Sequence, residues 1–213
     1  MAKILLTAGP TRAFIDDVRY LTNASSGRMA KALAEAALAR GHGVTIVSGP
    51  VQVAYPRKAR VIPVVTTAEM LAACRGAVAG VDGVIAAAAP CDFEPVRRAP
   101  GKIPRTGTGL TLKLAPTTDV IATLARQRRP GQWFVAFALE PGADPRRACA
   151  KITAKNCDLI VVNDVSALES AQNAVAVYDA HHALVGAKRA SKRAVAGWLL
   201  RLIEQRLAGR TGS

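Results

Sequence analysis

The fold is decided by three segments near the start of the chain: KILLTA (Lys3–Ala8), GRMAKALAEAALAR (Gly27–Arg40) and VTIV (Val44–Val47). The first and third are short apolar runs that are typical of buried strands, whereas the second has the length and the Ala/Leu content of a helix. Gly41 follows this helix as its stop signal. A strand, a helix and a second strand in this order predict a right-handed βαβ unit with two parallel strands.

The same alternation continues along the chain. The central segments are apolar at every position, as strands are when helices cover both faces of a parallel sheet. We therefore predict an α/β fold, a Rossmann-like, doubly wound, mostly parallel sheet with helices on both faces, in a single domain over residues 1–213. The further strands are expected at Arg60–Val65, Gly83–Ala88, Trp133–Leu139 and Asp158–Val162, the further helices at Ala68–Ala79, Thr118–Arg128, Pro145–Lys155 and Ser191–Leu207, and a hairpin at Val175–Tyr178 and Ala183–Val185.

The sequence also predicts helix caps, the inward face of the last helix and a long loop. Thr117 or Thr118 is expected to cap the helix that begins there, and Ser191 the last helix. Loops as long as Pro90–Gly109 inside a domain are usually functional or disordered, so we expect a functional loop there. The alternating stretch Leu110–Leu114 is expected to be an edge strand or a hairpin arm. The inward face of the last helix is expected to hold Ala194, Trp198, Leu202 and Ile203.

The composition limits the class of protein. The chain has 29 Lys and Arg against 15 Asp and Glu, and this net charge of +14 suits either nucleic acid or a nucleotide with a phosphorylated substrate. The dense group Lys188–Arg210 is expected to be a solvated helix face. The four cysteines form no CxxC pair and have no His at ligand spacing, so the metal ligands, if any, stay unknown. No apolar run approaches the ~20 residues of a membrane span, and no signal peptide fits before the first strand, so we expect a cytoplasmic protein without a membrane partner.

The first βα junction carries the strongest site signal. The segment Asn23–Gly27 opens the helix after the first strand. The N–H groups of a helix start, with the hydroxyl groups of Ser25 and Ser26 beside them, can bind an anion. The alternative is an ordinary serine cap. Asn23 is either a turn residue or an amide directed into the crevice above the sheet.

A second signal lies at the end of the strand Gly83–Ala88. The small side chains of Ala86–Ala89 would let a flat ring approach the backbone, and ligands of open α/β sheets bind outside such strand ends. Asp92 follows as an acid that could hold a cation or accept a hydrogen bond from a base or a sugar. Lys102, on the long loop, is either an exposed surface lysine or a charge that stabilises a phosphate in the transition state.

A third signal is the pair Lys151 and Lys155, four residues apart on one predicted helix. This spacing puts both ammonium groups on one face, where they are either solvated surface or ligands of an anion that offsets their repulsion. Phe137, near a strand end, is either a core residue or a platform for a base.

Several segments carry a family resemblance in this order: TAGPTR (Thr7–Arg12), VRYLTNASSGRMA (Val18–Ala30), VTIVSGP (Val44–Pro50), the strand end Ala86–Asp92, GKI (Gly101–Ile103) and AKITAKNCDLIVVNDVS (Ala150–Ser166). They resemble the phosphopantothenate–cysteine ligase family, whose domain is the C-terminal half of a bifunctional bacterial coenzyme A biosynthesis protein. The resemblance extends over nearly the whole chain.

The resemblance implies a ligase that joins 4′-phosphopantothenate to L-cysteine. The carboxylate attacks the α-phosphate of a nucleoside triphosphate, CTP in the common bacterial form, and the amine of cysteine then displaces the nucleotide. Mg²⁺ is expected with the triphosphate. The family is dimeric, and a loop from the neighbouring subunit completes the site, so we expect a homodimer. The flavin-dependent decarboxylase that normally accompanies this domain is expected on a separate protein.

The resemblance also implies roles for single residues. Asn23 would contact the reacting carboxyl group and the acyl-nucleotidyl intermediate, and Lys102 would stabilise formation of that intermediate. The candidate nucleotide-binding residues are Ser25, Ser26, Gly27, Ala86, Ala87, Ala88, Asp92, Thr117, Thr118, Asp119, Val120, Phe137, Lys151 and Lys155.

The chain departs from the family pattern near the expected nucleotide pocket. The usual Lys-x-Lys-Lys of the loop is Lys102-Ile103-Pro104-Arg105, and the usual Lys-Asn-Pro-Asp is Pro116-Thr117-Thr118-Asp119. Two other functions stay open: a nucleotide-sensing module without chemistry, and a nucleic-acid-binding domain whose affinity would fall steeply with salt. Because Asn23 and Lys102 are both kept, we expect an enzyme and not a sensing module. A ligase predicts no tight binding of DNA or RNA near physiological salt, so we expect no nucleic-acid partner.

Overall fold

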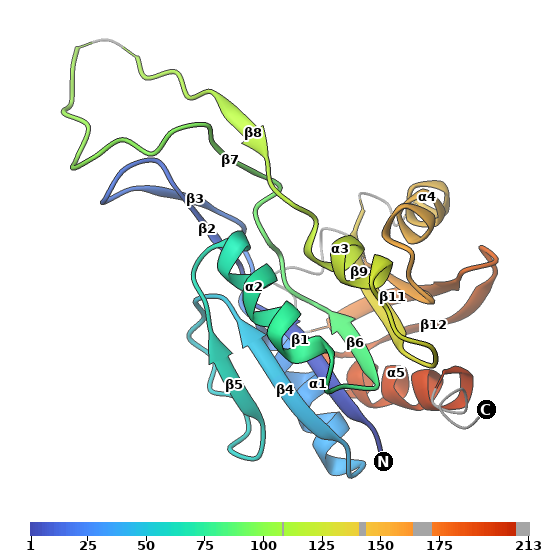
Figure 1. The fold of residues 1–213 in the computed structure, drawn as a ribbon. Helices are drawn as coiled ribbons and strands as arrows, with labels where there is room; N and C mark the ends of the chain where they lie inside the picture. The colour runs from blue at the N-terminus through green and yellow to red at the C-terminus, as the bar shows by residue number, and fades with distance from the viewer. Residues whose placement is uncertain (108, 141–143, 164–171, 208–213) are drawn as a thin grey trace.

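The computed structural model describes residues 1–107, 109–140, 144–163 and 172–207. Within them, an eight-stranded sheet has the order β12-β11-β10-β9-β6-β1-β4-β5 (Figure 1). Neighbouring strands from β10 to β5 are parallel, and β11 and β12 add an antiparallel hairpin. The strands are β1 (Lys3–Ala8), β4 (Gly43–Ser48), β5 (Arg60–Pro63), β6 (Gly83–Ala86), β9 (Trp133–Leu139), β10 (Leu159–Asn163), β11 (Gln172–Asp179) and β12 (Leu184–Ser191).

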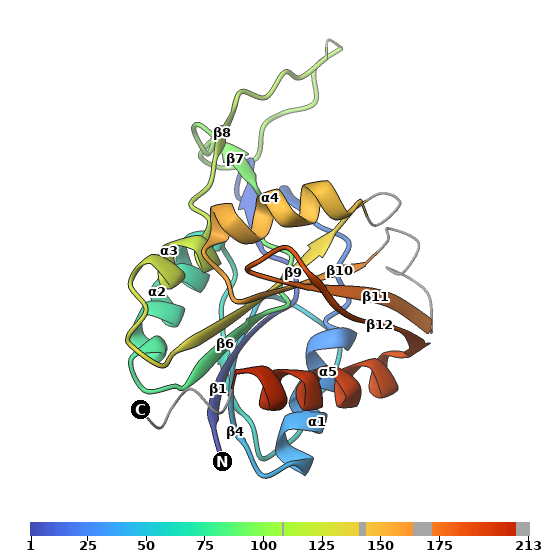
Figure 2. The ribbon, with the colours of Figure 1, turned by 90° about the vertical axis from the view of Figure 1, so that its right-hand side faces the viewer.

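The helices divide between the two faces of the sheet. On one face α1 and α5 pack against each other, and α2, α3 and α4 cover the other face (Figure 2). Successive residues of a strand point to opposite faces, and so Leu5 and Leu6 of β1 belong to different cores. The helices are α1 (Arg28–Ala39), α2 (Thr67–Val78), α3 (Val120–Arg126), α4 (Pro145–Lys155) and α5 (Lys192–Arg206).

The strand order determines where a ligand can bind. Numbered along the chain, the parallel strands β5, β4, β1, β6, β9 and β10 have the order 3-2-1-4-5-6 of a Rossmann fold. The chain leaves β1 toward one edge of the sheet and β6 toward the other, so the connections after these two strands diverge. A crevice forms outside the carboxyl ends of strands at such a point. The predicted Rossmann-like, mostly parallel sheet with helices on both faces is confirmed.

The predicted cap of α3 is wrong. Asp119 is the N-cap residue, and its carboxylate accepts from the Ala122 N–H at 2.9 Å. Thr117 is engaged elsewhere, because its hydroxyl donates to the Cys91 carbonyl at 2.6 Å. Neither Thr117 nor Thr118 therefore caps this helix.

The predicted cap of α5 is confirmed, and its predicted inward face is correct only in part. Ser191 Oγ accepts from the Ala194 N–H at 3.3 Å. Ala194 is exposed, whereas Trp198 and Leu202 are half-buried and pack against the core, with the ring of Trp198 beside Gly186 of β12. The buried face of α5 consists of Val195, Ala196, Leu199, Leu200 and Ile203.

An arm projects from the carboxyl end of the sheet (Figure 1). It consists of two antiparallel ribbons, β2 (Arg12–Phe14) with β3 (Tyr20–Thr22) and β7 (Phe93–Pro95) with β8 (Leu114–Pro116), and of the described residues between β7 and β8. Of the strand predicted at Leu110–Leu114, only Leu114 belongs to β8. The strand is short because its partner β7 has only three residues, and one further hydrogen bond, from the Val96 N–H to the Lys113 carbonyl, extends the pairing.

No helix in the described part of the chain combines the length and the apolar composition that a membrane crossing requires.

Candidate active site

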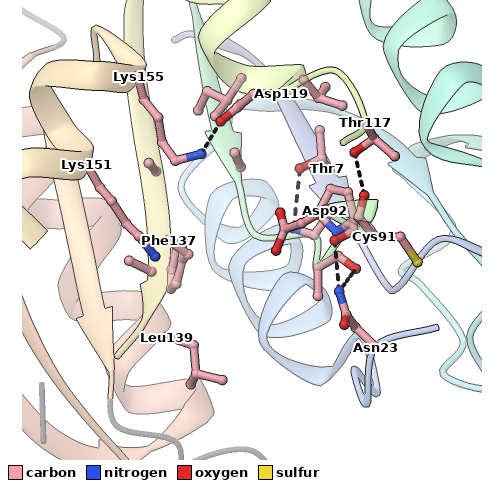
Figure 3. A pocket seen from close by; sticks show the side chains of 18 of the residues that line it. Thr7, Asn23, Cys91, Asp92, Thr117, Asp119, Phe137, Leu139, Lys151 and Lys155 are labelled. Atoms are coloured by element: carbon pink, nitrogen blue, oxygen red, sulfur yellow. Dashed lines mark hydrogen bonds and ion pairs between the residues drawn. The ribbon is translucent and has the colours of Figure 1, made fainter. Parts of the chain in front are cut away.

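A cavity of about 440 Å³, within the size range of small-molecule sites, opens at the carboxyl ends of β1, β6 and β9 (Figure 3). Its walls come from these strand ends, from α3 and from α4. The structure brings most of the predicted site residues together here. Its lining includes Asn23, Ala86, Ala88, Asp92, Thr117, Thr118, Asp119, Val120, Phe137, Lys151 and Lys155.

Asn23 lines this larger cavity beside the chain that leaves β6. Its Nδ2 donates to the carbonyl oxygen of Ala89 at 3.1 Å and to that of Pro90 at 2.8 Å (Figure 3). Both N–H groups of the amide are therefore used. The atom that is left for a ligand is Oδ1, which can only accept a hydrogen bond.

Lys151 and Lys155 of α4 lie on another wall, each in an ion pair with a carboxylate. Lys151 Nζ contacts Glu140, whose side chain is 1% exposed, and Lys155 Nζ lies 2.5 Å from Asp119 Oδ2. Burial raises the pKa of Asp119, but the Ala122 N–H and the Lys155 ammonium group outweigh it and lower that pKa. Each lysine thus enters the larger cavity with its charge already offset.

A smaller cavity of about 140 Å³ adjoins the larger one at the tips of β6 and β9. The two cavities share Ala88, Ala89 and the segment Phe137–Leu139. The remaining predicted residues line the smaller cavity: Ser25, Ser26, Gly27 and Ala87. The structure therefore divides the predicted nucleotide-binding residues into two groups that meet at the shared strand ends.

The start of α1 forms one wall of the smaller cavity. Gly27 is the N-cap residue with a φ of +72°, and no side-chain hydrogen bond caps the helix there. A Cβ on Gly27 would come within 2.9 Å of Val51 and 3.3 Å of Tyr55, so both the backbone and the space require glycine. The serine-cap alternative is wrong, and the start of α1 has the form that an anion site requires.

Sequence reasoning missed four polar residues of the smaller cavity: Arg28, Asn163, Asn173 and Lys192. Asn163 ends β10, Asn173 lies in β11 and Lys192 begins α5, so the last three reach the cavity only through the assembled sheet. No local pattern marked them. The Ser191 cap placed Lys192 at a helix start, but nothing in the sequence placed that helix beside α1.

Lys102 lies on the arm and lines neither cavity of its own chain. The residues on either side of it are held by two adjacent carboxylates. Asp16 accepts from the Ile103 N–H at 3.1 Å, and Asp17 accepts from the Gly101 N–H at 2.8 Å. Every predicted site residue except Lys102 thus lines one of the two cavities.

Asp16 is the buried anchor of this contact, since its side chain is 0% exposed. Its Oδ2 accepts from Arg19 Nε at 2.9 Å, and a terminal nitrogen of Arg19 donates to the Ile103 carbonyl at 2.8 Å. The Arg19 guanidinium group, opposed by burial and aided by the N–H groups of Arg19, Val18 and Ile103, holds the pKa of Asp16 far below its usual range. The Lys102 segment is therefore tied to the turn between β2 and β3.

Comparison with known proteins identifies the family. Residues 1–207 match the family described as "DNA/pantothenate metabolism flavoprotein C-terminal domain". The chain belongs to this family. The resemblance drawn from the sequence is confirmed.

Relatives in this family carry the domain as part of a longer protein. The coenzyme A biosynthesis bifunctional protein CoaBC of Bacillus subtilis (strain 168) is 42% identical over 165 residues, which cover 77% of this chain and 40% of that protein. CoaBC of Escherichia coli (strain K12) is 40% identical over 166 residues, which cover 76% of this chain and 41% of that protein. The chain spans about two fifths of the length of these relatives.

Solved structures share the fold. The crystal structure of the C-terminal domain of CoaBC is 33% identical, with a TM-score of 0.81, and the match covers 97% of this chain and 98% of that one. A histidine variant of Cab2 in complex with phosphopantothenate-cysteine has the same TM-score of 0.81 at 16% identity, covering 97% of this chain and 86% of that one. The likeness to Cab2 shows that the fold is shared.

Proposed function

We propose that this chain is a phosphopantothenate–cysteine ligase, which joins 4′-phosphopantothenate to L-cysteine and consumes a nucleoside triphosphate. The observation that carries the proposal is the pair of adjoining cavities at the point of the sheet where the connections after β1 and β6 diverge. Asn23 is hydrogen-bonded to Ala89, which lines both cavities. Membership of the family and the relatives named for coenzyme A biosynthesis support it.

In the first step, a carboxylate oxygen of phosphopantothenate attacks the α-phosphorus of the triphosphate. A new O–P bond forms while the bond to the β-phosphate breaks, so pyrophosphate leaves and an acyl-nucleotidyl intermediate remains. Negative charge builds at the α-phosphate, where one positioned cation contributes strongly to the rate. We assign this role to Lys102, and because it lines neither cavity of its own chain, it would act in the site of a neighbouring subunit.

In the second step, the amine of cysteine attacks the acyl carbon. The nucleoside monophosphate leaves with the electron pair of the C–O bond, and the amine loses a proton. Asn23 Oδ1 can accept from an N–H of this amine and so orient its lone pair. An acceptor suits the amine better than the reacting carboxylate, so the structure favours a contact of Asn23 with the second substrate. The product keeps the carboxylate of cysteine, on which a flavin-dependent decarboxylase would act as the proposed partner.

For the nucleotide we propose CTP with Mg²⁺. The larger cavity would take the base and the ribose beside Ala86 and Ala88, whose small side chains leave the backbone accessible. No group of three or more His, Cys, Asp and Glu side chains that could hold a metal occurs among the described residues. The residues present fit an ion that the triphosphate oxygens hold for the most part, with Asp92 or the buried amide of Asn173 adding an oxygen. When bound, Mg²⁺ would neutralise charge on the phosphates.

We propose that the enzyme is a homodimer that pairs through the arm. Large apolar side chains that are exposed concentrate there, and such a patch marks an interaction surface. Of the nine exposed large apolar side chains of the described structure, six lie on the arm: Val18, Tyr20, Phe93, Val96, Leu110 and Leu114. A partner seated on the arm would receive Lys102 at its own site.

The test is the release of pyrophosphate with phosphopantothenate, cysteine and each of the four common triphosphates in turn. We expect release that requires phosphopantothenate, is fastest with CTP, and is accompanied by the amide product only when cysteine is present. If no triphosphate is cleaved, and RNA or DNA binds near physiological salt, the nucleic-acid-binding alternative replaces the ligase.

A further inference from the structure

We propose that Glu140 is a positioning residue: it holds Lys151 in the wall of the larger cavity, where this lysine meets the phosphate groups of a nucleoside triphosphate. Arg147 shares the same carboxylate and so leaves Lys151 with charge to offer to the ligand. The inference rests on the proposed function in that the ligand is a triphosphate. It adds two residues, Glu140 and Arg147, that line neither of the two cavities.

Glu140 is a buried carboxylate at the end of β9. It directly follows Leu139, the last residue of that strand, and its N–H donates to the Asn163 carbonyl of β10 at 3.0 Å, which secures the backbone there. Its side chain is 1% exposed. A carboxylate is almost never buried so completely without a partner, because the loss of hydration disfavours its charge. The partners of Glu140 therefore indicate what this carboxylate does.

Two cations of α4 meet the carboxylate, one at each oxygen. Lys151 Nζ contacts Oε1, and Arg147 Nε lies 3.1 Å from Oε2. The two cations are four residues apart and therefore lie on one face of the helix. Since they share a single negative charge, one net positive charge stays at this end of the wall. At the other end, Lys155 and Asp119 form a pair of equal and opposite charges, so a polyanion is attracted more strongly to the end that holds Lys151.

Lys151 connects this buried cluster with the larger cavity. It lines the cavity, its side chain is 43% exposed, and Figure 3 shows it extending from α4 toward the cavity. A lysine in solvent samples many rotamers and loses this freedom when it binds a ligand. An ammonium group that is held in place before the ligand arrives avoids part of this loss. Glu140 therefore strengthens the binding of a triphosphate although both carry negative charge.

The direction of one change in affinity separates positioning from simple charge. Glu140→Gln removes a negative charge near the site, so electrostatic attraction alone would make a triphosphate bind more tightly. Positioning predicts the opposite, because a neutral amide holds the ammonium group of Lys151 less firmly. In calorimetric titrations CTP with Mg²⁺ should bind this variant about 10-fold more weakly, as expected when a charge-assisted contact is lost. The melting temperature of each variant is recorded to show that it folds.

A double-mutant cycle tests whether the effect passes through Lys151. In a Lys151→Ala background, Glu140→Gln should change the affinity for CTP less than about twofold, because the group that it positions is gone. In a Lys155→Ala background, the loss of about 10-fold should remain. A general disturbance of the fold would weaken binding in both backgrounds.

Arg147→Gln tests the shared carboxylate without a change at the buried position, and so it also serves if Glu140→Gln does not fold. Without Arg147, the charges of Glu140 and Lys151 cancel, and CTP should bind about fivefold more weakly. The control is Arg146→Gln, which removes the adjacent exposed cation and should change the affinity less than about twofold.

The proposal is overturned if Glu140→Gln binds CTP as tightly as the unmodified protein or more tightly, if its effect persists in the Lys151→Ala background, or if Arg147→Gln equals Arg146→Gln. Because these are binding measurements, CTP binding that follows the expected pattern without formation of the amide product would contradict only the proposed function. If no triphosphate binds the unmodified protein, both proposals are wrong.

Discussion

Asn23 donates both N–H groups of its side-chain amide to main-chain carbonyl oxygens. An aspartate has the same shape but cannot donate these two hydrogen bonds. Asn23→Asp would place a carboxylate against two carbonyl oxygens, so the side chain should turn away and the acceptor for the cysteine amine should be lost. We expect the first step to continue, the second to slow by about 10²–10³-fold, and the acyl-nucleotidyl intermediate to accumulate in quenched reactions examined by mass spectrometry. Lys102→Gln is the matched variant and should yield no intermediate, because the charge of Lys102 is proposed to act in the first step. If both variants lose the same step, the two roles are wrongly assigned.

At the scale of elements, the arm is tied to the β2–β3 turn through Asp16. Because the pKa of Asp16 is lowered in the folded chain, its contribution to stability is full above the unfolded pKa of about 3.9 and is lost as the pH falls toward the folded value. Asp16→Asn should therefore lower the melting temperature at pH 7, and this deficit should shrink below about pH 4. The variant should also be cleaved faster by trypsin after Lys102, because Ile103 loses its anchor. The control is Asp17→Asn, whose carboxylate is 52% exposed and should matter less. Equal melting curves for Asp16→Asn and the unmodified protein at pH 7 would contradict the anchor.

At the scale of the whole molecule, the position of Lys102 outside both cavities of its own chain predicts a site shared by two subunits. Asn23→Asp and Lys102→Gln should each be nearly inactive alone. Mixed in equal amounts and allowed to exchange subunits, they should recover up to about 25% of the unmodified activity, because half of the dimers then contain one intact site of two. Light scattering should report a dimer of the 22.3 kDa chain. A mixture that stays inactive although its subunits exchange would place Lys102 in the site of its own chain.

Much of the fold was predictable because its signals are local. β9 and α4 have the predicted limits, Trp133–Leu139 and Pro145–Lys155, since an apolar run and a helical spacing depend on near neighbours. The larger cavity was predictable for a related reason. Parallel strands end at one edge, so the residues that follow β1, β6 and β9 had to meet there. The cap of α3 was not predictable, because Asp119 and Thr117 both suit a cap and the choice depended on the distant Cys91 carbonyl.

Local patterns of residues were enough to predict the α/β fold, the Rossmann-like sheet and the edge of the sheet where ligands bind. The strand order and the pairing of charges were established by the folded chain. The tertiary structure paired Glu140 with Lys151, tied the neighbours of Lys102 to Asp16 and Asp17, and brought Asn173 and Lys192 to the start of α1. Secondary structure depends mainly on a residue's neighbours along the chain. The partners of a charge or a buried amide are often distant in sequence, so they are known only when the sheet and its helices have assembled.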